Sequence, residues 1–227
     1  MKVRTLLVTN LLIAVLMAAF AFWAAGQVAP GTELPTHWNA AGEVDDTMPA
    51  LQALLLPAGL ALLIGLVFAA IPWLEPLQDK LAGSAPLLRA TWIFVLGLMV
   101  ALQLFIAAPV FGFETGIEWI LVLVGLLFVA LGNMLPKSRP GFFVGIRTPW
   151  TITSTDNWIA THRLGGKLFL LAGVAIILVA LLDVPDILRP IVVVSAAVLV
   201  TLVPAAYSWW LWHSGRGQDG KGPAGEA

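Results

Sequence analysis

Residues 51–74 read LQALLLPAGLALLIGLVFAAIPWL and contain no Asp, Glu, Lys or Arg. The hydrocarbon core of a bilayer is about 30 Å thick, and a helix needs about 20 apolar residues to cross it. Backbone groups in lipid must be satisfied within their own segment, so this stretch is predicted to be a transmembrane helix. Five further stretches meet the same criterion, at roughly 6–28, 90–110, 117–135, 166–182 and 190–212. The sequence therefore predicts an all-α polytopic membrane bundle of six transmembrane helices.

The composition agrees with a protein surrounded by lipid. Of the 227 residues, 59% are hydrophobic and 11% are charged, whereas soluble domains are about 25% charged. The formal net charge of −1 provides no basic field for nucleic acid. The absence of cysteine excludes disulfides, thiolate metal sites and cysteine nucleophiles.

The first apolar stretch has a second interpretation. Lys2 and Arg4 before an apolar run, with Ala19-Phe20-Ala21 near its end, resemble a signal peptide and its cleavage site. The run is longer than a usual signal core, so we expect an uncleaved transmembrane helix.

The basic residues predict the orientation of the bundle, because Lys and Arg gather in the cytoplasmic segments of membrane proteins. If the N-terminus is inside, every Lys and Arg except Arg189 falls in an inner segment. The opposite orientation inverts this distribution. We therefore predict that both termini are cytoplasmic (N-in/C-in).

Loop lengths suggest three regions. Residues 1–89 form a first transmembrane hairpin with an outer motif loop at 29–50. Residues 90–213 form a four-helix membrane region with an inner motif loop at 136–165. The Gly-rich polar segment 214–227 is predicted to be a disordered cytoplasmic tail. Loops as long as these two are usually functional or disordered, and their Trp and apolar residues favour a folded, functional role.

The inner loop contains GIRTPWT at residues 145–151. Pro149 restricts Thr148 to extended geometry, and Trp150 provides a flat face on which the Arg147 guanidinium can stack. Anchoring at the membrane surface is the simpler explanation for Arg147, but anchoring alone does not require a Pro-Trp turn beside the charge.

A short helix is predicted after this turn, with Ser154 or Thr155 as its cap. Trp158 and His162 are four residues apart and share a face of it. Gly165 and Gly166 allow either a break or a close helix approach before the next span. A simpler role for His162 is a hydrogen bond to backbone at the membrane boundary. The predicted partner-binding residues of the inner loop are Gly145, Arg147, Thr148, Pro149, Trp150, Trp158, Thr161, His162 and Arg163.

The outer loop contains PTHWNAAGEVDD at residues 35–46. Asn39 to Gly42 is predicted to be a turn in which Gly42 takes positive φ. Three interpretations stay open: a solvated acidic loop, a folded lid anchored by a Trp, and a site for a divalent cation or a basic peptide. The predicted ligand-sensing residues are Pro35, His37, Trp38, Asn39, Gly42, Glu43 and Asp45, and the metal candidates are His37, Glu43, Asp45 and Asp46.

Polar groups inside the spans are few. The amides of Gln103 and Asn133 are predicted to join helices, and Pro57, Pro109 and Pro204 are assigned to local packing. No charged residue lies at mid-bilayer depth, which disfavours an ion-coupled transporter.

The two motif loops resemble a known family. Gly132 to Phe169 (GNMLPKSRPGFFVGIRTPWTITSTDNWIATHRLGGKLF) looks like the signature region of the SdpI family of bacterial immunity membrane proteins. Leu34 to Asp46 resembles the N-terminal domain that many members carry, with its Pro-x-His-aromatic-Asn pattern. Gly141 stands where the family commonly has asparagine, Asp46 where it commonly has glycine, and Trp38 replaces a usual phenylalanine.

This resemblance implies a non-enzymatic, multi-pass protein of the bacterial inner (cytoplasmic) membrane with no cofactor. Members protect their host from a secreted peptide toxin, and in the best-known operon the protein also captures a small cytoplasmic transcriptional repressor at the membrane. The expected partners are thus the lipid bilayer, a toxin outside and a repressor inside, with no direct nucleic-acid contact. The alternatives are a small transporter or lipid-handling protein, and a metalloenzyme on the outer face.

Overall fold

The computed structural model describes residues 3–39, 42–75, 78–114, 116–141, 143–185 and 187–216, with backbone only for 78–84. Within these residues six helices are long and apolar enough to cross a membrane, as predicted. They are α1 (Val3–Ala25), α2 (Ala50–Leu74), α3 (Gln78–Ala107), α4 (Ile117–Met134), α6 (Thr155–Leu181) and α7 (Leu188–His213). Short 3-10 turns follow two of them, η1 (Ala108–Phe111) after α3 and η2 (Leu135–Lys137) after α4, and a five-residue helix, α5 (Pro149–Thr153), precedes α6.

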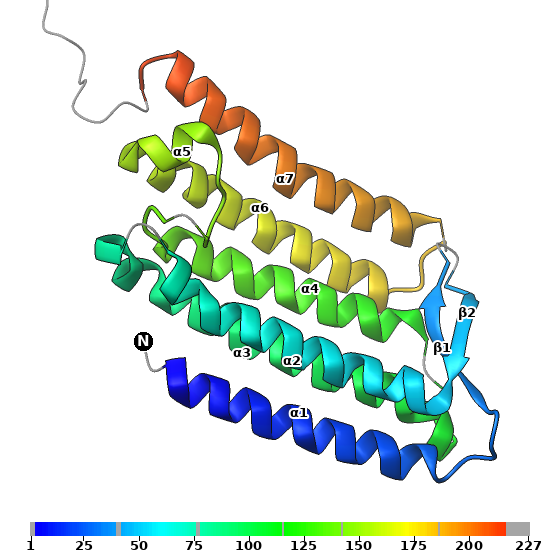
Figure 1. The fold of residues 1–227 in the computed structure, drawn as a ribbon. Helices are drawn as coiled ribbons and strands as arrows, with labels where there is room; N and C mark the ends of the chain where they lie inside the picture. The colour runs from blue at the N-terminus through cyan, green and yellow to red at the C-terminus, as the bar shows by residue number, and fades with distance from the viewer. Residues whose placement is uncertain are drawn as a thin grey trace, which may run out of the picture.

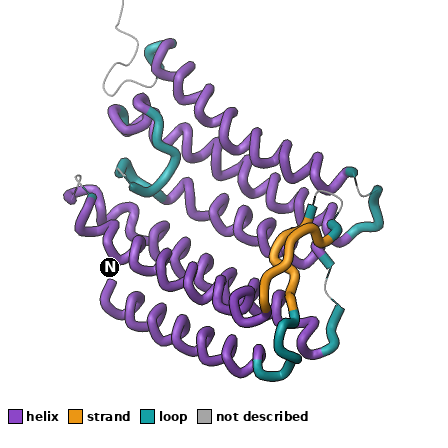
Figure 2. Tube along the Cα trace, turned by 45° about the vertical axis from the view of Figure 1, so that its right-hand side comes forward, coloured by secondary structure: helices purple, strands orange, loops and turns teal. Residues whose placement is uncertain are grey.

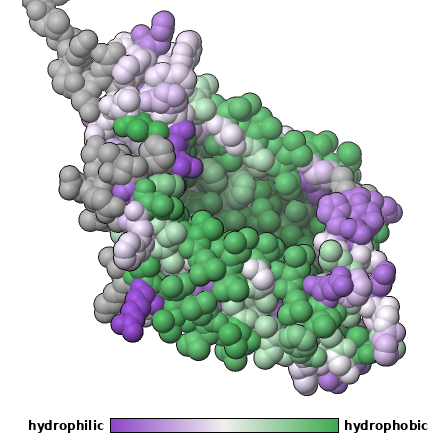
Figure 3. Space-filling model, viewed as in Figure 1, coloured by the Kyte–Doolittle hydropathy of each residue, from purple (hydrophilic) through white to green (hydrophobic). Residues whose placement is uncertain are grey.

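The helices form one layer-like bundle with two halves (Figure 1). One half contains α1, α2 and α3, the other contains α4, α6 and α7, and α3 contacts α4 between them. Large apolar side chains such as Leu63 and Val194 are exposed along the helices. Figure 3 shows this apolar surface across the middle of the bundle, with hydrophilic residues at both ends. The protein is thus a multi-pass membrane protein.

The two ends of the bundle differ. A two-stranded sheet, orange in Figure 2, lies at one end, which we call the hairpin end. The start of α1, the end of α7 and the segment 138–154 lie at the other, the loop end. All Lys and Arg side chains that the structure describes belong to the loop-end half, except Arg189. This separation agrees with the charge pattern of the sequence, while the direction of insertion in a cell stays a prediction.

The outer motif loop contains strands that the sequence analysis did not predict. Strands β1 (Glu33–Trp38) and β2 (Val44–Pro49) pair antiparallel, with irregular register around His37. The predicted turn is confirmed, because the Gly42 N–H donates to the Asn39 carbonyl at 2.9 Å and Gly42 has φ +85°. No residue separates β2 from α2, and the Ala50 N–H donates to the Thr32 carbonyl at 2.9 Å. The hairpin is thus joined directly to a transmembrane helix.

The fifth transmembrane helix is longer than predicted. Ser154 caps it as expected by accepting from the Asn157 N–H at 3.2 Å. The helix predicted to start here continues unbroken to Leu181, so it is one with the span that was predicted to begin near residue 166. Of the two roles considered for Gly165 and Gly166, a close approach is observed and a break is not: a Cβ at Gly165 would clash with the Ile146 side chain, and one at Gly166 would lie 2.7 Å from the Gly132 carbonyl oxygen. The predicted tail lies outside the described residues from residue 217 onward.

Two glycine pairs bring α4 and α6 into backbone contact. A Cβ added to Gly132 would lie 2.7 Å from the Gly166 carbonyl oxygen, and one added to Gly125 would lie 2.8 Å from that of Gly173. The pairs are two turns apart on each helix, so they lie along one seam. Small residues at such seams allow the close approach that drives helix association in lipid.

Buried amides join the helices of the other half. The Gln103 amide donates to the carbonyls of Met17 and Leu54 at 2.8 and 2.9 Å, which confirms its predicted role. Asn10, which the sequence analysis did not single out, donates to the Ala61 carbonyl and accepts from the Trp92 indole. Asn133 is exposed, so the expectation that it joins helices is wrong.

Candidate functional sites at the two ends of the bundle

A reciprocal pair of threonines builds the turn of the inner loop. Thr148 is extended, with φ −113° and ψ 161°, as the following proline predicts. Its hydroxyl accepts from the Thr151 N–H at 3.2 Å, and the Thr148 N–H donates to the Thr151 hydroxyl at 2.9 Å. The Thr151 hydroxyl also donates to the Ile146 carbonyl at 2.9 Å. These bonds form a capping box that starts α5.

His162 and Trp158 form the floor on which this turn lies. Their rings stack with centroids 4.0 Å apart and planes 16° apart. The Ile146 N–H donates to Nε2 of His162 at 2.8 Å, so Nε2 must accept and Nδ1 must carry the proton. Nδ1 then donates to the Trp158 carbonyl at 2.8 Å. The backbone role considered for His162 is therefore confirmed, with both ring nitrogens occupied.

Gly145 is required where the loop crosses this floor. Its φ is +118°, and a Cβ there would lie 2.5 Å from His162 Nε2 and 2.7 Å from the Trp158 ring. A side chain would therefore both strain the backbone and push the loop off the rings.

A buried polar network fastens the loop to α7. The Thr148 hydroxyl lies 3.0 Å from the Ser208 hydroxyl, and the Asn157 amide donates to the Ser208 carbonyl at 2.8 Å. The Thr161 hydroxyl donates to Asn157 Oδ1 at 3.1 Å. At the start of the loop, the Trp158 indole donates to the Ser138 hydroxyl at 3.1 Å. Such fully bonded networks give a segment one arrangement.

Glu75 is a loop-end residue that the sequence analysis missed. It follows α2 directly, is only 4% exposed, and accepts from the Phe143 N–H at 3.1 Å. A buried carboxylate is costly unless hydrogen-bonded, so this contact ties α2 to the inner loop. The available signal was a lone acidic residue immediately after an uncharged span.

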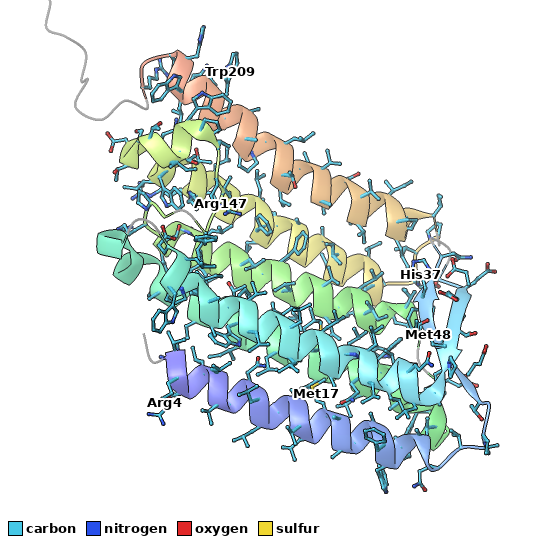
Figure 4. All side chains as sticks on the ribbon, in the orientation of Figure 1. Arg4, Met17, His37, Met48, Arg147 and Trp209 are labelled. Carbon is cyan, nitrogen blue, oxygen red and sulfur yellow. The ribbon has the colours of Figure 1, made fainter. Side chains whose placement is uncertain are left out.

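The predicted partner-binding residues separate into two groups. Trp158, Thr161 and His162 are at most 1% exposed. Their side chains support the loop, so the prediction that they form part of an accessible binding surface is wrong. Arg147 and Arg163 are exposed at the loop end, where Figure 4 labels Arg147. Pro149 is exposed and Trp150 is partly buried.

The hairpin holds the predicted ligand-sensing residues together. His37 Nδ1 lies 2.6 Å from Asp45 Oδ1, and both side chains are well exposed, at 68% and 41%. Next to the turn, the Asn39 amide donates to Glu43 Oε2 at 3.0 Å, and the Glu43 N–H donates to Asn39 Oδ1 at 3.0 Å. His37 projects from the hairpin end in Figure 4.

The hairpin is packed on the bundle. Leu34 is 2% exposed within a core formed with α1, α2 and α3. The Trp38 ring meets the Phe105 ring edge-on at 5.2 Å, and Pro35 pairs opposite Thr47 in the sheet. This packing agrees with the folded-lid interpretation. Among the residues that the structure describes, no three His, Asp or Glu side chains gather where they could hold a metal, the set around Asp46 included.

In the part of the chain that the structure describes, these features define a multi-pass membrane protein with a structured polar motif at each end. Residues 137–208, from η2 through the inner loop to Ser208, match the SdpI/YfhL protein family. Residues 12–62, which include the hairpin, match a domain of unknown function, DUF1648.

One curated relative extends the match over most of the chain. Immunity protein SdpI of Bacillus subtilis (strain 168) is 22% identical over 179 residues, which is 78% of this chain and 84% of that protein. No solved structure matches. The protein is therefore a membrane protein related to immunity proteins.

Proposed function

We propose that this protein confers resistance to a secreted peptide toxin, and that toxin engagement at the hairpin is transmitted to the inner loop, where a cytoplasmic repressor binds. The relationship to immunity protein SdpI supports the first part. The second part rests on one structural observation: α2 is joined directly to the hairpin at one end and to the inner loop through Glu75 at the other.

The path begins at the hairpin. His37 and Asp45 are the exposed polar pair that a peptide reaches first. The Leu34 and Trp38 contacts transfer any displacement of the hairpin to the helices below. Since β2 continues into α2 without a linker, this displacement moves the helix as one body.

The path ends at the inner loop. A shift of α2 moves the Glu75 carboxylate, which holds the Phe143 N–H. Phe143 precedes the turn that carries Arg147, so the displacement changes how this exposed arginine is presented. Arg147 and Arg163 provide positive charge suited to an acidic patch on a partner. Coupling of this kind requires two arrangements of the bundle with different affinity for the outer ligand.

Challenge of a susceptible bacterial strain with a secreted peptide toxin tests the proposal. The strain would express this protein or one of its variants. We expect survival with the wild-type chain and with Glu114→Gln, an exposed hairpin-end carboxylate. Glu75→Ala should reduce signalling to a repressor-controlled reporter, and Glu75→Gln, which keeps an acceptor for Phe143, should restore most of it. Death of cells expressing wild-type protein would refute the immunity role, and an unchanged reporter in membranes containing Glu75→Ala would refute the α2 path.

A further inference from the structure

A pocket at the hairpin end adjoins the outer motif but extends beyond it to α4 and α7. It has a volume of about 150 Å³ and lies where the hairpin turn meets the starts of α4 and α7. Its lining includes Asn39, Gly42, Ile117, Leu121, Arg189 and Val193. Three segments far apart in the sequence thus enclose one space at the boundary between the apolar belt and the polar end.

The polarity of the pocket changes with depth. Ile117 and Arg189 lie in the first turns of their helices, and Leu121 and Val193 lie one turn further toward the middle of the bundle. Residues four apart share a helix face, so each helix contributes its two residues to the same wall. The cationic group is therefore at the level of the membrane surface, and apolar side chains continue below it.

The charge of this end selects the kind of anion. Arg189 is the sole Lys or Arg at the hairpin end of the described chain. Described acidic residues surround this end: Glu33, Glu43, Asp45, Asp46, Glu114, Glu118 and Asp183. Their combined field repels small anions approaching from solution. An anion that is already anchored in the membrane is less affected by this repulsion, because the bilayer holds it at high local concentration at the depth of the pocket.

We infer that this pocket binds the headgroup of an anionic phospholipid. Its phosphate would pair with the Arg189 guanidinium, which matches phosphate geometry, and the first carbons of an acyl chain would lie along Leu121 and Val193. Gly42 packs closely on α4, since a Cβ there would lie 2.9 Å from the Ile117 side chain. A lipid in the pocket would therefore contact both the hairpin and the start of α4. This inference does not depend on the proposed immunity function.

Lipid titration with detection by native mass spectrometry tests the inference on the full chain in detergent. Phosphatidylglycerol should bind at least tenfold more tightly than phosphatidylcholine of the same chain length. Arg189→Gln should lower phosphatidylglycerol affinity about tenfold, and Val193→Trp should do so by filling the pocket. The matched controls are Arg4→Gln, an exposed arginine at the loop end, and Leu199→Trp, an exposed α7 position; both should bind as wild type does.

The remaining outcomes separate the alternatives. Glycerol phosphate without acyl chains should not compete at concentrations comparable to the lipid, and effective competition would indicate a site for soluble anions and overturn the lipid assignment. Equal losses in Arg4→Gln and Arg189→Gln would mean general charge attraction and would also overturn it. If the single variants Arg189→Gln and Val193→Trp both bind phosphatidylglycerol with wild-type affinity, this pocket holds no lipid.

Discussion

Replacing Gly145 with alanine should destabilise the protein by about 2–5 kcal/mol. The backbone there has φ +118°, a region that costs a residue with a side chain about 1–2 kcal/mol. The new methyl would also lie 2.5 Å from His162 Nε2 and 2.7 Å from the Trp158 ring, and overpacking of this kind costs about 1–3 kcal/mol. The two rings are buried and hydrogen-bonded, so neither can move away cheaply.

Two further glycines separate the contributions. Gly31 has φ +86° and open space where a methyl would be added, so Gly31→Ala measures backbone strain alone, about 1–2 kcal/mol. Gly97 lies in α3 with open space around it, so Gly97→Ala should be neutral or stabilise by up to about 1 kcal/mol through helix propensity. Chemical unfolding in mixed micelles, followed by Trp fluorescence, gives the free energies. If Gly145→Ala and Gly31→Ala lose equal stability, the close approach of the loop to the rings is wrong.

Two other predictions concern the helices and the orientation. Gln103→Leu should lose about 1–2 kcal/mol in the same unfolding assay, because it removes two interhelical hydrogen bonds. Asn133→Leu, at an exposed position, should change the stability little. Similar losses in both variants would refute the role of the Gln103 amide. The chain has no cysteine, so a single introduced cysteine reports the accessibility of its position. In intact cells a membrane-impermeant maleimide should label Val44→Cys in the hairpin but not Thr153→Cys in α5. The reverse pattern would refute the N-in/C-in prediction.

The transmembrane helices were predictable because length and hydropathy alone decide whether a segment crosses lipid. The hairpin was not, because β1 and β2 are short, carry Pro at 35 and 49, and lack a clear alternation of apolar and polar residues. The pairing instead depends on contacts with α2 and α3 that a local pattern does not contain. The length of α6 stayed open for a similar reason: Gly165 and Gly166 allow either a break or a close approach, and only their contacts with Ile146 and Gly132 in the folded protein show which one occurs.

The inner turn illustrates what a motif can and cannot predict. The extended Thr148, the Ser154 cap and the shared face of Trp158 and His162 follow from local rules, and all three are confirmed. Which side chains are buried depends on where the loop folds back, and local rules do not predict this. Trp158, Thr161 and His162 were therefore predicted to contact a partner, whereas they are buried and support the loop. Glu75 is distant in sequence from its partner, and no local pattern joins it to Phe143.

The length of α6 makes the protein responsive to the membrane itself. Its 27 residues span about 40 Å, roughly 10 Å more than the hydrocarbon core. The excess corresponds to the polar first turns, which carry Asn157 and Thr161 and anchor the inner loop. A thicker bilayer would draw these turns into hydrocarbon or force the helix to tilt. Hydrophobic mismatch, set by acyl-chain length, would then change the position of the inner loop without any ligand.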